Sequence, residues 1–223
     1  VFAGTTPEKR LETAFDALEA MRENDADALV GLGGGSSLDI ARVVAVLATR
    51  DETPEEVARE FSRMRILTLD GTPPPVFAVP TTLAGADMSN TGGVTMSPDS
   101  GLLEDTETEV DEETSGGYSD ASLMPSAAFY DPALFAATPR SALAGSAING
   151  FNKGIETLYS SNATPLTDAT ASRGTRLLRD GLLAYGKREE GLDDMAKGVM
   201  LVQYGISRPD EMTVSVVHAF GHG

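Results

Sequence analysis

Residues 28–39, with the sequence Ala-Leu-Val-Gly-Leu-Gly-Gly-Gly-Ser-Ser-Leu-Asp, decide the fold of this chain. The apolar run at the start is typical of a buried strand, and three consecutive glycines predict a turn that no side chain obstructs. Ser36 or Ser37 is expected to cap the helix that follows. The apolar positions of that helix are Leu38, Val43, Val46 and Leu47. This order forms a cradle for phosphate, because the first N–H groups of a helix lack partners and carry partial positive charge.

The glycine turn differs from two common nucleotide-binding loops. No Gly-Lys-Ser/Thr follows the glycines, which excludes a Walker P-loop. The positions of Ser36 and Leu38 do not fit the Gly-x-Gly-x-x-Gly spacing. A plain turn without a ligand is therefore the alternative, and the remainder of the chain favours the phosphate site.

The composition is strongly acidic. The 223 residues include 34 Asp and Glu against 17 Lys and Arg, a formal net charge of −17. A nucleic-acid partner is not expected, because its phosphates would be repelled. Acidic residues are spread along the chain and only four lysines are present, which suits a surface that stays hydrated in concentrated salt. We expect a halophilic, haloarchaeal source, with an acidic mesophile as the alternative.

Cysteine and long apolar runs are both missing from the sequence. Without cysteine, disulfides, zinc ribbons and thiol nucleophiles are excluded. No run reaches the length of a membrane span and the first four residues are no signal peptide, which predicts a cytoplasmic protein without a membrane partner. Because the chain starts without Met and stops inside the motif His218–Gly223, we expect a piece of a longer chain. A homodimer stays open.

Helix and strand patterns alternate in the first half of the chain. Helical spacing covers Pro7–Arg22 and Thr53–Arg65, and short apolar strands are expected at Pro75–Pro80 and Ala127–Tyr130. Such alternation predicts an α/β fold with a doubly wound, Rossmann-like parallel sheet. The acid run within Gly101–Asp120 is expected to be a solvated loop or hairpin tip rather than a metal site.

The second half of the chain has helical spacing throughout. Helices are expected at Pro139–Ser160, Pro165–Ala184, Leu192–Tyr204 and Met212–His222. We therefore expect two domains. They are a dinucleotide-binding α/β domain at residues 1–135 and a helical catalytic domain at residues 136–223.

A second motif follows the second expected strand. Pro80, Thr81 and Thr82 open a small, hydroxyl-rich segment that suits close approach by a cofactor, although such clusters also cap helices. Together with Gly33–Asp39 this segment resembles a motif pair of the iron-containing alcohol dehydrogenase superfamily, which has a dehydroquinate synthase-like fold. Further matches to the superfamily are Tyr130–Pro132, Ala144–Tyr159 and His218–His222. Two details look more like maleylacetate reductases, namely the spacing in Thr81–Met88 and the stretch Ile155–Pro165.

The resemblance implies a bound NAD or NADP and a catalytic centre between an α/β and a helical domain. It also implies a first strand–helix portion and a C-terminal helical portion beyond this chain. The residues implied to hold the cofactor are Gly33, Gly34, Gly35, Ser36, Ser37 and Asp39 around the pyrophosphate, with Thr81 and Thr82 on the nicotinamide side.

Metal-using members of that superfamily offer Asp-x-x-x-His on one helix and His-x-x-x-His on a later one. Here Asn149 and Lys153 occupy the first pair, and His218 begins the second. An amide is a poor substitute for a carboxylate ligand and an ammonium repels a divalent cation, so we expect no bound iron or zinc. Lys153 is instead a candidate to bind a substrate carbonyl or carboxylate, the alternative being a snorkelling side chain at a domain edge.

The resemblance implies hydride transfer between NAD(P)H and a small carbonyl or alcohol substrate. His222 is the first candidate for the proton donor, with His218 shaping the pocket, whereas a histidine pair one turn apart can also be structural. Two alternatives stay open. One is a nucleotide-binding paralogue without turnover, and the other is a sugar-phosphate cyclase or polyol dehydrogenase of the same wider fold.

Overall fold

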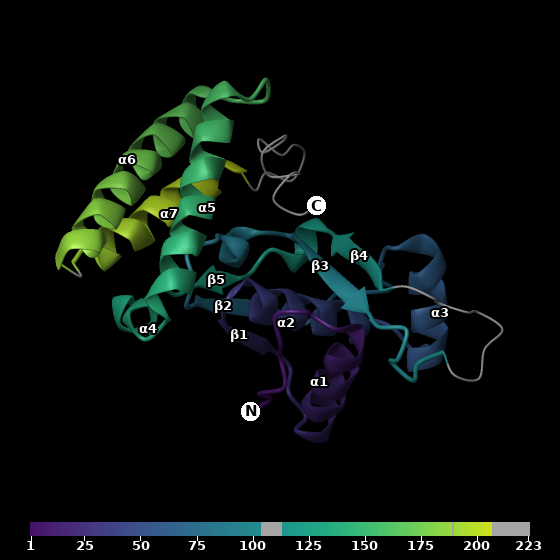
Figure 1. The fold of residues 1–223 in the computed structure, drawn as a ribbon. Coiled ribbons are helices and arrows are strands. Elements are labelled where there is room, and N and C mark those ends of the chain that lie inside the picture. The colour runs from purple at the N-terminus through teal and green to yellow at the C-terminus, as the bar shows by residue number, and fades with distance from the viewer. Residues whose placement is uncertain (104–112, 189, 207–223) are drawn as a thin grey trace. The chain divides into compact units, whose positions relative to one another are not determined.

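The computed structural model describes residues 1–103, 113–188 and 190–206 (Figure 1). These residues form two compact units. The α/β unit consists of Val1–Ala78 and Asn90–Ala128, and the helical unit consists of Val79–Ser89 and the described part of Phe129–Gly223. The predicted domain boundary between residues 135 and 136 stays a prediction for the whole protein.

A three-stranded sheet organises the α/β unit. Its strands are β1 (Leu29–Gly33), β2 (Val76–Pro80) and β5 (Ala127–Ala128), in the order β1-β2-β5. β2 pairs with β5 in parallel, with Phe77 opposite Ala127. The predicted fold class, a Rossmann-like α/β part followed by a helical part, is confirmed (Figure 1).

Helices α1 (Leu11–Glu23) and α2 (Gly35–Leu47) pack against each other in this unit. The predicted apolar positions of α2 are confirmed as core positions, and each is at most 2% exposed. α1 begins four residues later than predicted. The cause is Lys9, whose φ of 53° lies in the left-handed region and interrupts any helix that starts at Pro7.

The prediction of a buried strand at the start of the glycine motif is wrong for half of its side chains. Val30 and Leu32 are 65% and 58% exposed, whereas Gly31 is buried and faces Leu38 and Ala41 of α2. Side chains alternate between the two faces of a strand. A helix that packs on one face therefore does not bury the side chains on the opposite face, here Val30 and Leu32.

An antiparallel hairpin completes the α/β unit. A hairpin tip was one of the two expectations for residues 101–120, but the two strands themselves were not predicted. β3 (Thr91–Met96) pairs with β4 (Thr114–Ser119), so the expected loop at residues 101–120 is wrong over β4. Both strands contain paired glycines, which have low strand propensity and hide the pattern. The acidic residues 104–112 lie outside the described residues.

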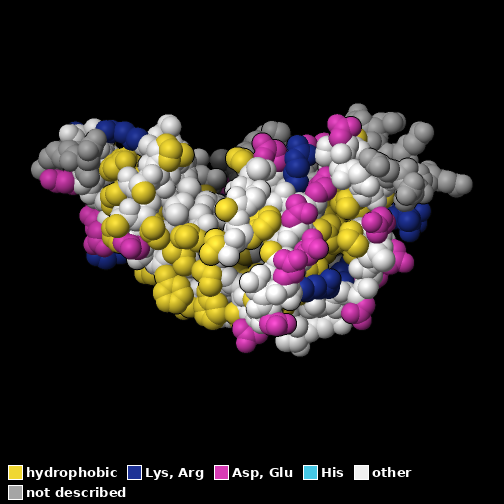
Figure 2. Space-filling model, turned by 90° about the horizontal axis from the view of Figure 1, so that it is seen from below, with side chains coloured by type: hydrophobic (Ala, Val, Ile, Leu, Met, Phe, Trp, Pro, Cys, Tyr) yellow, Lys and Arg dark blue, Asp and Glu magenta, His cyan; other side chains and the backbone are white. Residues whose placement is uncertain are grey.

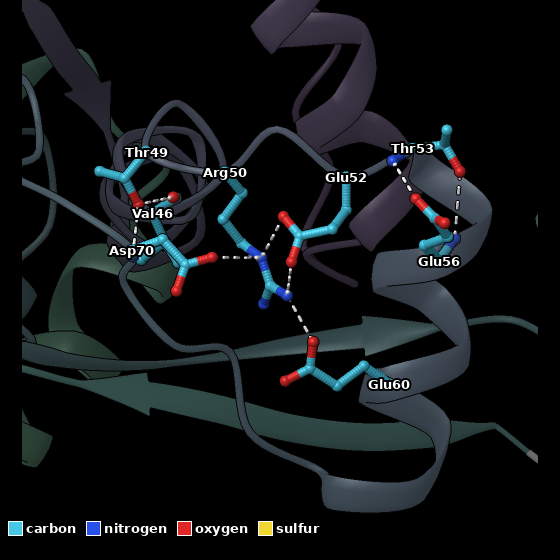
Figure 3. Close-up of polar contacts among 8 residues, drawn as sticks. All are labelled: Val46, Thr49, Arg50, Glu52, Thr53, Glu56, Glu60 and Asp70. Carbon is cyan, nitrogen blue, oxygen red and sulfur yellow. Dashed lines mark hydrogen bonds and ion pairs between the residues drawn. The ribbon is translucent and has the colours of Figure 1, made fainter.

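Helix α3 (Pro54–Met64) confirms the prediction for Thr53–Arg65. The Thr53 hydroxyl accepts from the Glu56 amide at 3.3 Å, and the Glu56 carboxylate accepts from the Thr53 amide at 2.9 Å, which forms a capping box. Beside it, the buried Arg50 donates to Glu60 and, at 2.9 Å, to Glu52 (Figure 3). These contacts join the end of α2 to the start and the middle of α3.

Four α-helices follow in the described part of the helical unit. They are α4 (Pro132–Ala136), α5 (Arg140–Tyr159), α6 (Pro165–Arg188) and α7 (Leu192–Ile206). Three of them confirm predictions, whereas the predicted helix Met212–His222 lies outside the described residues. α4 was missed because five residues are too few for a periodic pattern. α5 and α6 run side by side, and both contact α7 (Figure 1).

Glycines bring these helices close together. A Cβ on Gly174 of α6 would lie 2.6 Å from the carbonyl oxygen of Gly198 in α7, so only glycine allows this approach. The core between the helices is apolar. Its buried members are Leu83, Phe135, Leu143, Ala147, Leu178, Met195, Ala196, Val199, Val202 and Ile206.

The surface carries the acidic charge of the sequence. Figure 2 shows Asp and Glu side chains spread over the face that it draws, where hydrophobic side chains are also exposed. Among the described helices, none is both long enough and apolar enough to cross a membrane.

Candidate cofactor site

The glycine turn between β1 and α2 depends on the conformation of Gly33. Its φ is +144°, and a Cβ at this position would lie 2.5 Å from the Ser37 hydroxyl oxygen. Only glycine adopts such a backbone without strain. The chain can therefore turn at Gly33 directly from the strand into the helix.

The prediction that Ser36 or Ser37 caps α2 is wrong. Gly34 is the N-cap residue, with extended backbone, and both serines lie in the first helical turn. The Gly34 carbonyl accepts from the amides of Ser37 at 3.1 Å and Leu38 at 3.2 Å. The helix starts early because the glycines already supply the turn, so a capping side chain is not required.

Gly31 sets the distance between α2 and the strand. A Cβ on Gly31 would lie 2.9 Å from Leu38 Cδ2 and 3.3 Å from Ala41 Cβ, so the helix rests almost on the strand backbone. Residues 33–37 are all half-buried, which leaves part of this backbone open to solvent. The amides of Gly35 and Ser36 precede the first hydrogen-bonded amide of α2 and fit a phosphate group.

Asp39 lies in the second turn of α2 and points to the β3–β4 hairpin. Its carboxylate accepts from Lys9 and Arg42, each at 3.2 Å, and its backbone carbonyl accepts from the Tyr118 hydroxyl at 3.1 Å. Burial, followed by the nearby charge of Asp39, raises the pKa of Tyr118. The described contacts of Asp39 thus fasten α2 to the hairpin, and its role toward a cofactor stays a prediction.

The segment Thr81–Met88 follows β2 and belongs to the helical unit. The Thr138 hydroxyl donates to the Thr81 carbonyl at 2.7 Å. The Leu83 amide donates to the Ser146 hydroxyl at 3.0 Å, and the Leu83 side chain is fully buried in the helical core. Thr81 and Thr82 are half-buried, so part of their surface stays accessible.

Asp87 is a buried carboxylate that the sequence analysis quoted without assigning a role. It is 1% exposed and accepts a hydrogen bond from the Tyr130 hydroxyl. Burial, followed by the charge of Asp87, raises the pKa of Tyr130. A carboxylate within a segment of small residues was the signal available in the sequence, but its partner lies 43 residues away.

The two predicted metal-site residues on α5 are one turn apart, as their spacing requires. Asn149 is exposed and Lys153 is half-buried, and the Lys153 ammonium donates to the Ala84 carbonyl at 2.8 Å. A bonded ammonium in this place does not fit a metal ligand set. Within the described residues, no group of three His, Cys, Asp or Glu side chains could hold a metal ion. We therefore derive no chemical step through a metal.

Both histidines lie outside the described residues. The expected roles of His218 and His222 therefore stay predictions. The glycine turn belongs to the α/β unit, whereas the Thr81–Met88 segment and Lys153 belong to the helical unit.

Comparison with known proteins gives a consistent result. The family described as iron-containing alcohol dehydrogenase matches residues 1–132. Long-chain-alcohol dehydrogenase 1 of Geobacillus thermodenitrificans is 30% identical over 205 residues, which cover 90% of this chain and 47% of that protein. Maleylacetate reductase of Pseudomonas knackmussii is 29% identical over 177 residues, which cover 78% of this chain and 38% of that protein. The chain thus spans about half the length of the curated relatives it matches, or less.

A solved structure has the same fold. Sulfoacetaldehyde reductase from Bifidobacterium kashiwanohense, determined in complex with NAD+, superposes with a TM-score of 0.74 at 20% sequence identity. The match covers 94% of this chain and 52% of that chain. At this level of identity the likeness concerns the fold.

Proposed function

The chain belongs to the iron-containing alcohol dehydrogenase family, and from this premise we propose that the protein is an NAD(P)-dependent oxidoreductase. Its substrate would be a small alcohol or carbonyl compound. The observation that carries the proposal is the turn at Gly33. Because Gly33 has a positive φ and no side chain, the first residues of α2 follow directly after the end of β1.

Two segments of this chain would each contact the cofactor. The amides of Gly35 and Ser36, at the start of α2, would donate to the pyrophosphate, where the helix dipole also favours negative charge. Thr81 and Thr82 would face the nicotinamide side. The bound NAD(P)H supplies the hydride.

Reduction of a carbonyl also needs a proton for the alkoxide oxygen. We propose that His222 donates it and that His218 shapes the pocket. A positioned general acid of this kind contributes about 10²–10⁴ in rate. The resemblance of the His218–His222 spacing to the family pattern supports this assignment.

We also propose that the reaction is independent of metal and is of the maleylacetate reductase kind. Support comes from Asn149 and Lys153, which replace two expected ligands by an amide and an ammonium. The 29% identity to a maleylacetate reductase points the same way. Turnover that persists after treatment with a chelator would support this part, and turnover that requires added iron or zinc would overturn it.

The test of cofactor binding is Gly34→Val in the full-length protein, titrated with NADH and NADPH by calorimetry. Gly34 has φ −75° and ψ −176°, which any residue adopts, so valine fits the backbone while its side chain covers the phosphate-binding amides. We expect binding to be lost and the fold to be kept. The matched control is Gly186→Val, because a Cβ there meets open space. Unchanged affinity in Gly34→Val would place the cofactor elsewhere.

A paralogue that binds nucleotide without turnover is the second candidate. The observation that favours it is the Lys153 ammonium, which is engaged by a backbone carbonyl. A reduction assay over a panel of small carbonyl compounds separates the two candidates. Binding of NADH or NADPH without reduction of any compound in the panel would favour the paralogue.

A further inference from the structure

One backbone carbonyl of the helical unit accepts hydrogen bonds from two helices. The Ala84 oxygen receives Lys153 Nζ of α5 at 2.8 Å and Gln203 Nε2 of α7 at 3.3 Å. Gln203 is 2% exposed, so its amide is committed to the interior. A carbonyl oxygen has two lone pairs and can accept both donors.

The backbone around Ala84 is shaped to receive these donors. Gly85 has φ +84°, and a Cβ there would lie 1.8 Å from Gln203 Nε2. A Cβ on Gly150 of α5 would lie 2.8 Å from the Leu83 carbonyl oxygen. Two glycines therefore allow α5 and α7 to reach the segment, and a side chain at Gly85 would displace Gln203.

We propose that Lys153 and Gln203 are positioning residues, which clamp the Ala84 carbonyl and so hold Thr81 and Thr82 in place for the cofactor. The clamp itself needs no ligand, whereas its effect on the cofactor rests on the proposed function. Lys153 acts here through the protein backbone. It takes the place that the family pattern gives to a metal ligand and links α5 to the segment without a metal.

The clamp is tested first by hydrogen exchange in the full-length, cofactor-free protein. The variants are Lys153→Met, Gln203→Leu and the double variant, with Lys197→Met as control because Lys197 is an exposed lysine of the same unit, paired with Asp193. Each single variant should speed exchange of the amides at residues 83–88 about tenfold. The double variant should exceed the product of both, because only there does the carbonyl lose both donors.

The effect on the cofactor is tested by titration with NADH and NADPH and by steady-state kinetics. Both single variants should weaken binding of the preferred dinucleotide about tenfold, with a smaller change in kcat. Lys153→Arg, which keeps a charged donor, should restore part of the affinity. A fall in kcat with unchanged affinity, confined to Lys153→Met, would overturn the proposal and assign Lys153 to the substrate.

Three further outcomes are decisive. Unchanged exchange in the double variant overturns the clamp. Faster exchange with unchanged dinucleotide affinity overturns its positioning role. A parent protein that binds neither dinucleotide overturns the proposed function and the positioning role together, while the exchange rates still decide whether the clamp exists.

Discussion

Two turns follow neighbouring strands of one sheet and are built in opposite ways. The turn after β1 depends on glycines: Gly33 and Gly34 carry no side chain, and Gly31 within the strand lets α2 pack close to the strand backbone. The segment after β2, Thr81–Met88, is held by side chains from Thr138, α5 and α7. A turn that binds a ligand through its backbone amides cannot carry side chains that cover those amides. A turn that binds through its side chains needs contacts from other elements to hold its backbone in place.

The largest expected effect tests whether the braced segment belongs to the helical core. Leu83→Ala should destabilise the protein by about 2–5 kcal/mol, because it empties a fully buried site. Leu32→Ala beside the glycine turn is the matched control. Leu32 is 58% exposed, so its loss should stay within about 0.5 kcal/mol. Chemical unfolding measures both, and equal losses would remove the contrast between the two turns.

A smaller effect tests the backbone character of the glycine turn. Gly33→Ala should cost about 1–3 kcal/mol, because its φ of +144° disfavours any side chain. Gly34→Ala, at φ −75°, should change stability far less. Thermal unfolding of the pair decides the point. If the two variants unfold at the same temperature, a special conformation of Gly33 is not what makes this turn.

The smallest effect distinguishes the Arg50 contacts from the Ala84 clamp by their response to acid. A hydrogen bond from Arg50 lowers the pKa of Glu52 below its ordinary value of 4.5 in the folded state. Its contribution to stability is therefore complete above pH 4.5 and is lost as the pH falls through the lower folded value. The Ala84 clamp contains no carboxylate and should not respond in this range.

Arg50→Met measures this acid response. The variant should lose less stability than the parent between pH 6 and pH 3, and the difference should be small because the Glu52 side chain is 38% exposed. Urea unfolding at several pH values gives the comparison. Parallel pH profiles for the two proteins would show that Arg50 does not stabilise the Glu52 carboxylate.

The glycine turn could be predicted because all of its signals are adjacent in sequence. The same holds for α3, because Thr53 and Glu56 lie three residues apart and form the sequence pattern of a capping box. The strands of the hairpin could not be predicted, because glycines in β3 and β4 make room for the side chains of Tyr118 and Phe61 and so dilute the strand pattern. Exposure of Val30 depends on what covers the sheet, which a local pattern does not contain.

The candidate site likewise combines features that a local sequence pattern predicts with contacts between distant residues that it does not predict. The spacing of Asn149 and Lys153 correctly predicted two residues one turn apart on a helix. The bond from Lys153 to Ala84 spans 69 residues, and that from Gln203 spans 119. No periodicity or motif encodes such pairs, so the bracing of the Thr81–Met88 segment appears only once the helices are in place.

Because Val79–Ser89 packs with the helices, the helical unit is discontinuous along the chain. During synthesis, Leu83 leaves the ribosome before the residues of α5, α6 and α7. Its side chain therefore stays exposed to water until the helical core forms around it. A gene fragment that begins at Phe129 would encode the helices without that leucine. The core of the helical unit therefore includes a side chain from a segment that lies, along the chain, between two parts of the α/β unit.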